Sequence, residues 1–195
     1  MSTMFSFGHA HDYFETTIQN ARNAVERAQL SALEERFDEI VDTITQQFAL
    51  TAVELGEPTA STEEVVVEAN RFAGAGFFAP GQSVRRPGTR VTISVPFTGS
   101  TGLLQHQPQT FDLAPNEATI AGTTVYLIRD FVDPQTEQVK AWRDQELGRL
   151  RSRVGNANAA VAGFNDRLKA QVVLIAENRR TRLRGQRSLE DELNS

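Results

Sequence analysis

The sequence contains no cysteine among its 195 residues. This excludes disulfide bonds, thiolate nucleophiles and cysteine-ligated metal sites, and it gives no support to secretion. No window approaches the roughly 18 uncharged apolar residues that a membrane-spanning helix needs, and residues 1–9 lack the basic and apolar regions of a signal peptide. We therefore expect a soluble, cytoplasmic protein that makes no contact with a membrane.

Sequence motifs of catalysis are also lacking. The chain has no glycine-rich phosphate loop and no serine elbow. The carboxylates within residues 34–39 lie beside an apolar helical stripe, and no histidine or lysine among them completes an acid–base set, so they indicate a solvated helix face. We expect that the protein is not an enzyme and that it binds no cofactor.

Histidine is scarce, with three residues in the whole chain. His9, His11 and Asp12 resemble part of a metal site, but the remaining histidine, His106, is distant in the sequence. Structural metal sites usually need about four ligands. The simpler interpretation is an exposed helix start with Asp12 near its N-terminus, where the helix dipole favours a negative charge. We expect no metal site.

Charge is distributed unevenly along the chain. Residues 1–84 carry 4 basic and 13 acidic side chains, a net charge of −9, whereas residues 85–195 carry 16 and 12, a net charge of +4, which together give the overall −5. The acidic part is therefore able to lie against the basic part. The densest basic cluster comprises Arg179, Arg180, Arg182, Arg184 and Arg187. These arginines are candidates for contact with a partner or with nucleic acid.

Two interpretations of this arginine cluster remain open. Guanidinium groups bind a phosphate backbone and release its counterions. Arginines near a helix C-terminus are, however, favoured by the helix dipole, and no aromatic residues lie between them to stack on bases. We prefer pairing with acidic groups of this chain or of a protein partner over binding to nucleic acid.

The most regular pattern of the sequence lies in residues 134–187, where apolar residues recur at alternating spacings of three and four. This spacing is typical of a helix that packs along another helix. Pro134 suits the first helical position, and Gly185 is a plausible C-terminal cap. The expected packing seam consists of Leu147, Leu150, Val154, Val161, Phe164 and Leu168.

Two further features of this helix concern its contacts. Gly148, Gly155 and Gly163 interrupt it at a combined cost of roughly 2–3 kcal/mol relative to alanine, although glycines also permit close approach of another backbone. Trp142, the only tryptophan, could anchor a partner, since tryptophan is enriched at interface hot spots. Alternatively, it seals the junction between the helix and a β layer.

Residues 12–49 carry two apolar helical stripes that are offset by one residue. The offset predicts either one helix whose buried face rotates or two helices broken near Ser31. Ser31 and Glu34 fit a capping box, which gives the break a local cause. These helices can pair antiparallel with the C-terminal helix over most of its length.

The sequence between residues 62 and 132 has the alternating pattern of short strands separated by glycine and proline turns. Residues 85–88 are interpreted as a turn, and Pro96 predicts a strand end at an edge or a bulge, because proline cannot donate to the ladder. Ala121-Gly122 is the expected hairpin turn. The expected strands are residues 64–68, 90–97, 110–113, 118–120 and 123–128.

Together these patterns predict an α+β fold, in which a long antiparallel coiled-coil-like helical stalk carries an inserted small antiparallel β domain. The expected segments are an N-terminal helical region (1–55), the β domain (56–133), a long C-terminal helix that pairs with the N-terminal helices (134–187) and an acidic tail (188–195).

Several segments together resemble a known module: Phe5–His9, Val91–Gly99, Gln107–Phe111, Val161–Asn165 and Glu177–Arg182. With these residues the chain resembles the N-terminal helix–β–helix module of bacterial phage-defence proteins that carry a restriction-endonuclease-like or TIR effector domain. The resemblance covers most of the chain. It implies a non-catalytic sensing, regulatory or assembly module of antiviral defence.

In the resembling proteins an effector domain follows the module, whereas this sequence ends at Ser195. The effector is then separately encoded, or the chain is a fragment, or the likeness is one of architecture only. We expect a regulatory subunit that acts through a protein partner, through self-association, or through both. The alternatives from other classes are a structural or assembly protein, for example of phage origin, and a nucleic-acid-binding module that uses the arginine cluster.

Overall fold

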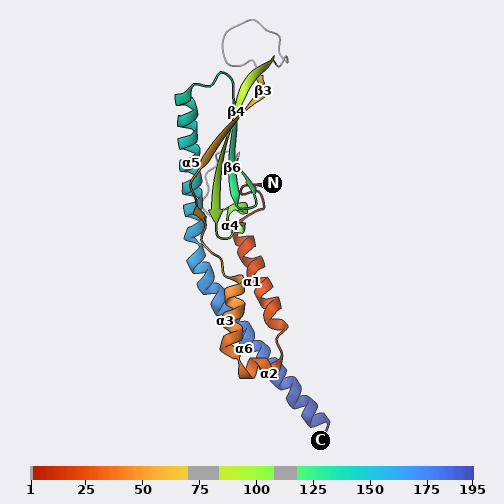
Figure 1. Ribbon diagram of the computed structural model, residues 1–195. Coiled ribbons are helices and arrows are strands. Elements are labelled where there is room, and N and C mark those ends of the chain that lie inside the picture. Colours follow the sequence, from red (N-terminus) through yellow and green to blue (C-terminus); the bar gives the residue numbers. More distant parts are fainter. Residues whose placement is uncertain (1, 70–83, 108–117) are drawn as a thin grey trace.

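A computed structural model describes residues 2–69, 84–107 and 118–195. The molecule is elongated, with an antiparallel sheet at one end, helices at the other, and a long bent C-terminal helix that runs along both (Figure 1). The N-terminus lies beside the sheet, and the C-terminus lies at the far tip of the helical end. The predicted α+β class with a small antiparallel sheet is confirmed.

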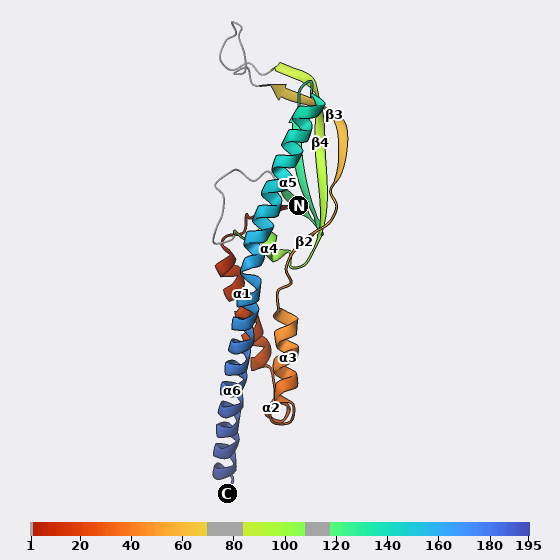
Figure 2. The same ribbon diagram turned by 90° about the vertical axis from the view of Figure 1, so that its left-hand side faces the viewer.

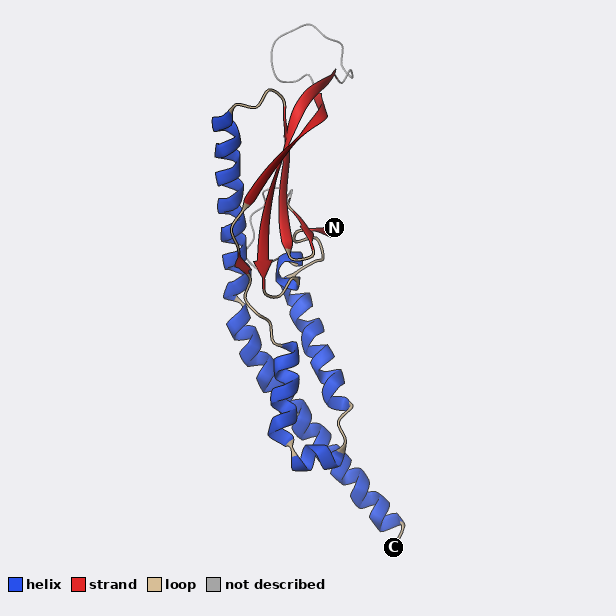
Figure 3. Ribbon diagram, in the orientation of Figure 1, coloured by secondary structure: helices blue, strands red, loops and turns tan. Residues whose placement is uncertain are grey.

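Strands of the described segments form one antiparallel sheet in the order β1-β5-β6-β4, with β2 and β3 both pairing with the other side of β4. Figure 3 shows that these strands gather at one end of the molecule. Their bounds are β1 (Ser2–Thr3), β2 (Glu54–Leu55), β3 (Thr59–Ala69), β4 (Val84–Thr98), β5 (Thr119–Ala121) and β6 (Thr124–Phe131).

The alternation predicted for residues 90–97 is confirmed in β4. Val91, Ile93, Val95 and Phe97 are all buried, because alternate side chains of a strand point to the same face. The predicted hairpin of residues 118–128 is confirmed as β5 and β6, with Gly122 in a positive-φ turn conformation. The strand predicted at residues 110–113 lies outside the described residues.

Residues 85–88 do not form the predicted turn. They lie within β4, where Arg85 pairs with Glu68 and Gly88 pairs with Val65. They form a strand because β3 pairs with β4 as far as Val84. β6 ends opposite Thr89, so β4 is an edge strand here, and an edge strand tolerates a proline.

The prediction of a bulge or an edge at Pro96 agrees with the strand register. Leu55 pairs with Phe97, and Thr59 pairs with Ser94. Three residues, 56–58, therefore stand opposite two, Val95 and Pro96, and this extra residue separates β2 from β3.

The helices of the described chain lie mainly at the end away from the sheet. In chain order they are α1 (Ala10–Glu26), α2 (Leu30–Glu35), α3 (Phe37–Phe48), α4 (Gly102–Gln105), α5 (Thr136–Ala159) and α6 (Val161–Leu193). Figure 2 shows α1 and α3 beside α6, while α5 continues along the sheet.

The N-terminal helical region is broken, which confirms the prediction of separate helices. The break is not made by the predicted capping box at Ser31. The chain leaves α1 at Arg27 and enters α2 at Gln29, whose side chain makes no capping hydrogen bond. The chain then reverses into α3, so that α6 packs against two N-terminal helices that also pack against each other. The offset stripes arise because each helix turns its own apolar side, including Ile18 of α1 and Ile44 of α3, towards this shared core.

The long C-terminal helix is divided at Ala160, which lies between α5 and α6. The C-terminal cap predicted at Gly185 is wrong, because α6 continues through this residue to Leu193. Most of the expected acidic tail, 188–195, is therefore helical. A glycine inside a helix costs about 1 kcal/mol relative to alanine, which is too little to end a long helix by itself.

Candidate functional site

The predicted packing seam of the long helix is buried along its whole length. Its side chains are at most 7% exposed: Leu147, Leu150, Val154, Val161, Phe164 and Leu168. In α6 the seam faces the N-terminal helices, where the rings of Phe164 and Phe14 stack with their centres 4.7 Å apart. In α5 it faces the sheet instead, since Leu150 lies close to Leu127 of β6. The seam therefore joins the two ends of the molecule.

Trp142 joins α5 to the sheet. Its indole is 6% exposed and meets the ring of Phe131 edge to face, with the ring centres 5.6 Å apart. Edge-to-face pairs of this kind contribute about 0.5–1.5 kcal/mol beyond the area they bury. This arrangement corresponds to the alternative in which the tryptophan seals the junction, and it leaves little of the side chain for a partner.

The arginine cluster at the end of α6 lies against the acidic N-terminal helices. Arg179 and Arg182 form ion pairs with Glu26, and Arg184 donates from Nε to Glu34 over 2.7 Å. The guanidinium of the fourth arginine, Arg180, lies 4.5 Å from the centre of the Phe37 ring. Arg187 is exposed.

Basic residues of the C-terminal part of the chain thus pair with acidic residues of its N-terminal part. Two further pairs extend the same pattern along α6, from Arg167 to Glu15 over 3.1 Å and from Lys169 to Asp42 over 3.3 Å. Exposed pairs of this kind contribute only about 0–1 kcal/mol each. We infer that they fix the position of α1 and α3 along α6 rather than supply much stability.

This pairing predicts weak binding to nucleic acid. At about 150 mM salt, fluorescence anisotropy should detect no binding, or only non-specific binding, to DNA or RNA, because the phosphate groups would have to displace Glu26 and Glu34. Low-micromolar affinity that is lost when Arg179, Arg180 and Arg182 are changed to alanine would contradict this prediction. Changing Arg151, an exposed arginine of α5, to alanine is the control.

Two asparagines hold the segment between α3 and β2 against the long helix, and sequence reasoning missed both. The Leu50 N–H donates to Oδ1 of Asn165 over 2.9 Å, and Nδ2 of Asn165 donates to the Leu50 carbonyl over 2.9 Å. Asn158 makes the same two bonds with the N–H and carbonyl of Val53, each 2.8 Å long. A signal was available, because these asparagines are seven residues apart in a helix, where asparagine is a poor helix former.

These two carboxamides lie on either side of Ala160, where α5 gives way to α6. Each carboxamide pairs with the N–H and the carbonyl of one residue. These residues lie in the segment between α3 and β2, which belongs to no helix or strand. Because buried backbone groups are costly to leave unpaired, the bonds fix this connection between the sheet and the helical end.

His9 and His106 both lie near the start of α1. His9 is the residue before α1, and the His106 ring stacks on Tyr13 with the ring centres 4.8 Å apart, while its Nδ1 lies 2.9 Å from the Gly102 carbonyl oxygen. Burial raises the pKa of Tyr13. Within residues 2–69, 84–107 and 118–195, no three histidine or acidic side chains come close enough together to hold a metal ion.

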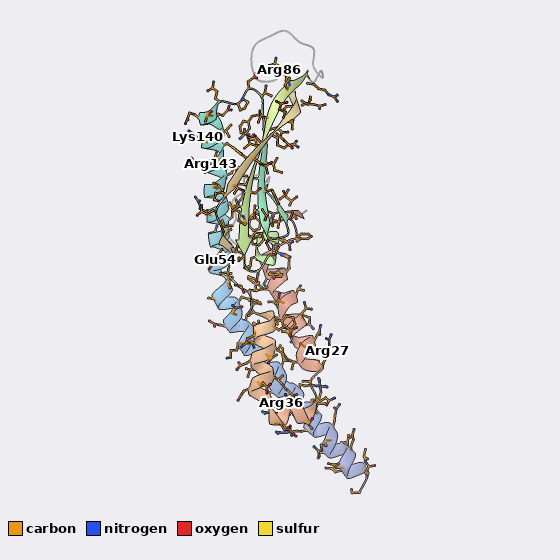
Figure 4. The ribbon with its side chains drawn as sticks, in the orientation of Figure 1. Arg27, Arg36, Glu54, Arg86, Lys140 and Arg143 are labelled. Carbon is orange, nitrogen blue, oxygen red and sulfur yellow. The ribbon has the colours of Figure 1, made fainter. Side chains whose placement is uncertain are left out.

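Two hollows lie at the end of the molecule that contains the sheet. One, of about 670 Å³, lies where the β3–β4 hairpin meets the turn into α5, and its lining includes Val66, Arg86 and Pro134. Figure 4 shows Arg86 high on this hairpin, while Lys140 and Arg143 point outward from the start of α5. Val66 is 68% exposed, so this hollow is open to solvent.

The second hollow, of about 450 Å³, lies between β6 and α5 and is lined mainly by charged side chains. Arg90 donates to both carboxylate oxygens of Asp130, over 2.7 and 3.0 Å, and this pairing lowers the pKa of Asp130. Across the hollow, Arg149 donates to Glu146 over 2.7 Å. Of the two hollows, this one brings the most polar groups together.

No helix in the described part of the chain is long and apolar enough to cross a membrane. No protein-family model, curated protein or solved structure matches the sequence or the fold.

Proposed function

We propose that this chain is a non-catalytic interaction and regulatory module, used for sensing or assembly, of a bacterial anti-phage defence system. The resemblance of residues 91–99 and 161–165 to a module of such systems supports the biological setting. The observation that carries the interaction role is the outer surface of the long helix, which bears residues that the described chain does not use in its own packing.

The exposed glycines of the long helix are the first part of this observation. Gly148, Gly155 and Gly163 are all exposed, and a Cβ atom added at any of them would meet nothing within 4 Å. The chain therefore bears a helix-propensity cost of roughly 2–3 kcal/mol, although no close contact within the described residues requires glycine. Another helix backbone, by contrast, can approach closely at such positions.

The projecting end of α6 is the second part. Beyond the turn formed by α2, the helix extends away from the body (Figure 1), and Leu189 and Leu193 are 57% and 76% exposed. Leucines four residues apart lie on one side of a helix, where a partner helix can cover them. We propose that α1, α3 and α6 act as a coiled-coil-like stalk whose outer side contacts a separately encoded effector or a second copy.

In this proposal the protein works in the cytoplasm without a membrane or a cofactor. A structural or assembly protein, for example of phage origin, would use the same outer surface, and the genes beside this one distinguish the two settings. Nuclease or TIR genes favour defence, and capsid or tail genes favour the structural role. A nucleic-acid-binding role has less support, because Arg179, Arg182 and Arg184 are paired with glutamates.

The glycines offer a test in which stability and assembly change in opposite directions. Changing Gly155 and Gly163 to alanine should raise the free energy of unfolding by about 1–2 kcal/mol in total, because alanine is the better helix former and finds free space. The same change should weaken self-association, measured by light scattering, or effector capture from the native cell. Protection against phage, measured by plating, should fall with it.

Changing Gln138 to alanine, at an exposed position of α5 ten residues before Gly148, is the matched control and should leave association unchanged. The interaction role fails if the glycine variant is more stable yet associates and protects as the parent does. It also fails if the parent is strictly monomeric, captures no partner, and can be deleted without any change in phage sensitivity.

A second test addresses the absence of catalysis. We expect purified protein, incubated with plasmid DNA, ATP or NAD and with magnesium or manganese, to show no turnover above that of a blank purification. The chain offers no set of residues arranged to activate water or a nucleophile within its described segments. Turnover that follows the protein through successive purification steps would overturn the non-catalytic assignment.

A further inference from the structure

The charged hollow between β6 and α5 owes its position to the short length of β5. Thr119 of β5 pairs with Tyr126, so residues 128–130 of β6 have no β5 residues beside them, and α5 passes along this edge instead. Trp142 rests on Phe131 and fixes the distance of α5 at one end of the hollow. A volume of about 450 Å³ lies within the range of about 300–1,000 Å³ that small-molecule sites occupy.

The guanidinium groups outnumber the carboxylates in this hollow. Its lining includes Arg90, Arg129 and Arg149 but only two acidic residues, Asp130 and Glu146. Both oxygens of Asp130 accept bonds from Arg90, which also reaches Glu63 over 3.3 Å. The two carboxylates of the lining are therefore engaged by Arg90 and Arg149, whereas Arg129 has no carboxylate partner among the described residues.

Among the three arginines that line this hollow, Arg129 is the one without a carboxylate partner in the described residues. No ion pair among the described residues includes it, and its guanidinium carbon lies 5.3 Å from the centre of the Phe131 ring. A guanidinium held over a ring keeps its N–H groups at its edge, where they can donate to a ligand. Arg149 uses one nitrogen for Glu146 and keeps other N–H groups for the same purpose.

We propose that this hollow binds a small anionic molecule, and that Arg129 and Arg149 donate hydrogen bonds to its phosphate or carboxylate group. Guanidinium groups suit both kinds of oxyanion, because their parallel N–H groups match two oxygens at once. Glu146 positions Arg149, and Phe131 positions Arg129. The site is independent of the glycine surface and the projecting helix end on which the interaction role rests.

Isothermal titration of the full chain at about 50 mM and 150 mM salt tests this site, with inorganic pyrophosphate and ATP as phosphate probes and citrate as the carboxylate probe. At least one probe should bind at a ratio of one to one. Trp142 lines the hollow and is the only tryptophan, so its fluorescence should change with the same affinity. Comparing the phosphate probes with citrate decides which group the site prefers.

Changing Arg129 or Arg149 to glutamine should weaken the best probe at least tenfold. Changing Arg143, an exposed arginine of α5 outside the hollow that pairs with Asp144, to glutamine should weaken it less than twofold. Circular dichroism melts of each variant show whether its fold is intact, and Arg129 is exposed, so its replacement should be tolerated. The site is refuted if no probe binds at millimolar concentration, or if all three variants weaken binding equally.

Discussion

Replacing Phe164 by aspartate is expected to unfold most of the molecules at room temperature. Phe164 is 3% exposed and stacks on Phe14, at the point where α6 meets α1. Truncating a buried phenylalanine costs about 3–5 kcal/mol, and placing a carboxylate in the same apolar site adds several more. This sum is comparable with the about 5–15 kcal/mol by which whole domains are stable.

The measurement is a thermal or urea melt followed by circular dichroism, with Ala162→Asp as the control. Ala162 is exposed two residues away on the same helix, so it introduces the same charge without burying it. We expect the control to cost less than about 1 kcal/mol. If both variants melt alike, the seam does not hold α6 in place.

The second large effect is expected at the two asparagines that hold residues 50–53. Changing Asn165 to alanine should cost about 2–4 kcal/mol, because the N–H and the carbonyl of Leu50 each lose their hydrogen bond in a part-buried position. The same change at Asn158 should have a similar cost through Val53. The double change should loosen the connection between the sheet and the helical end.

Amide hydrogen exchange locates this effect. In the parent chain the amides of Leu50 and Val53 should exchange slowly, and each should lose its protection only when its own asparagine is replaced. Asn178→Ala is the matched control, because Asn178 is an exposed asparagine of the same helix. Equal protection of both amides in the parent and in the double variant would show that other groups hold this segment.

Hydrophobic periodicity predicted the elements of this protein well where a single face is buried. The seam of the long helix and the alternate residues of the strand around Ile93 are both buried as expected. Apolar residues spaced by three to four in a helix, or by two in a strand, lie on one face, and only that face can pack into the core. The predictions failed at local signals. Ser31 and Gly185 carry the residue types of a helix start and a helix end, yet α2 begins at Leu30 and α6 continues through Gly185 to Leu193.

The candidate sites were less accessible to sequence reasoning. The charge asymmetry predicted that the arginine cluster pairs with acidic residues. It did not identify the partners, Glu26 and Glu34. The spacing of Asn158 and Asn165 was visible in the sequence, but their partners Val53 and Leu50 were not, because a carboxamide reveals its role only when the backbone that it binds is in place. The charged hollow brings Arg129 and Arg149 together from a strand and a helix, and no spacing in the sequence encodes that distance.

The sequence by itself determined the α+β class, the apolar seam and the attraction between its two halves, since these follow from local periodicity and composition. Tertiary structure decided that the N-terminal helices fold back into a pair beside α6. It also decided that the part of the seam in α5 meets the sheet and that Pro87 lies inside a strand. The physical reason is that burial and backbone hydrogen bonding act between segments far apart in the chain. They override local propensities of about 1 kcal/mol wherever the two conflict.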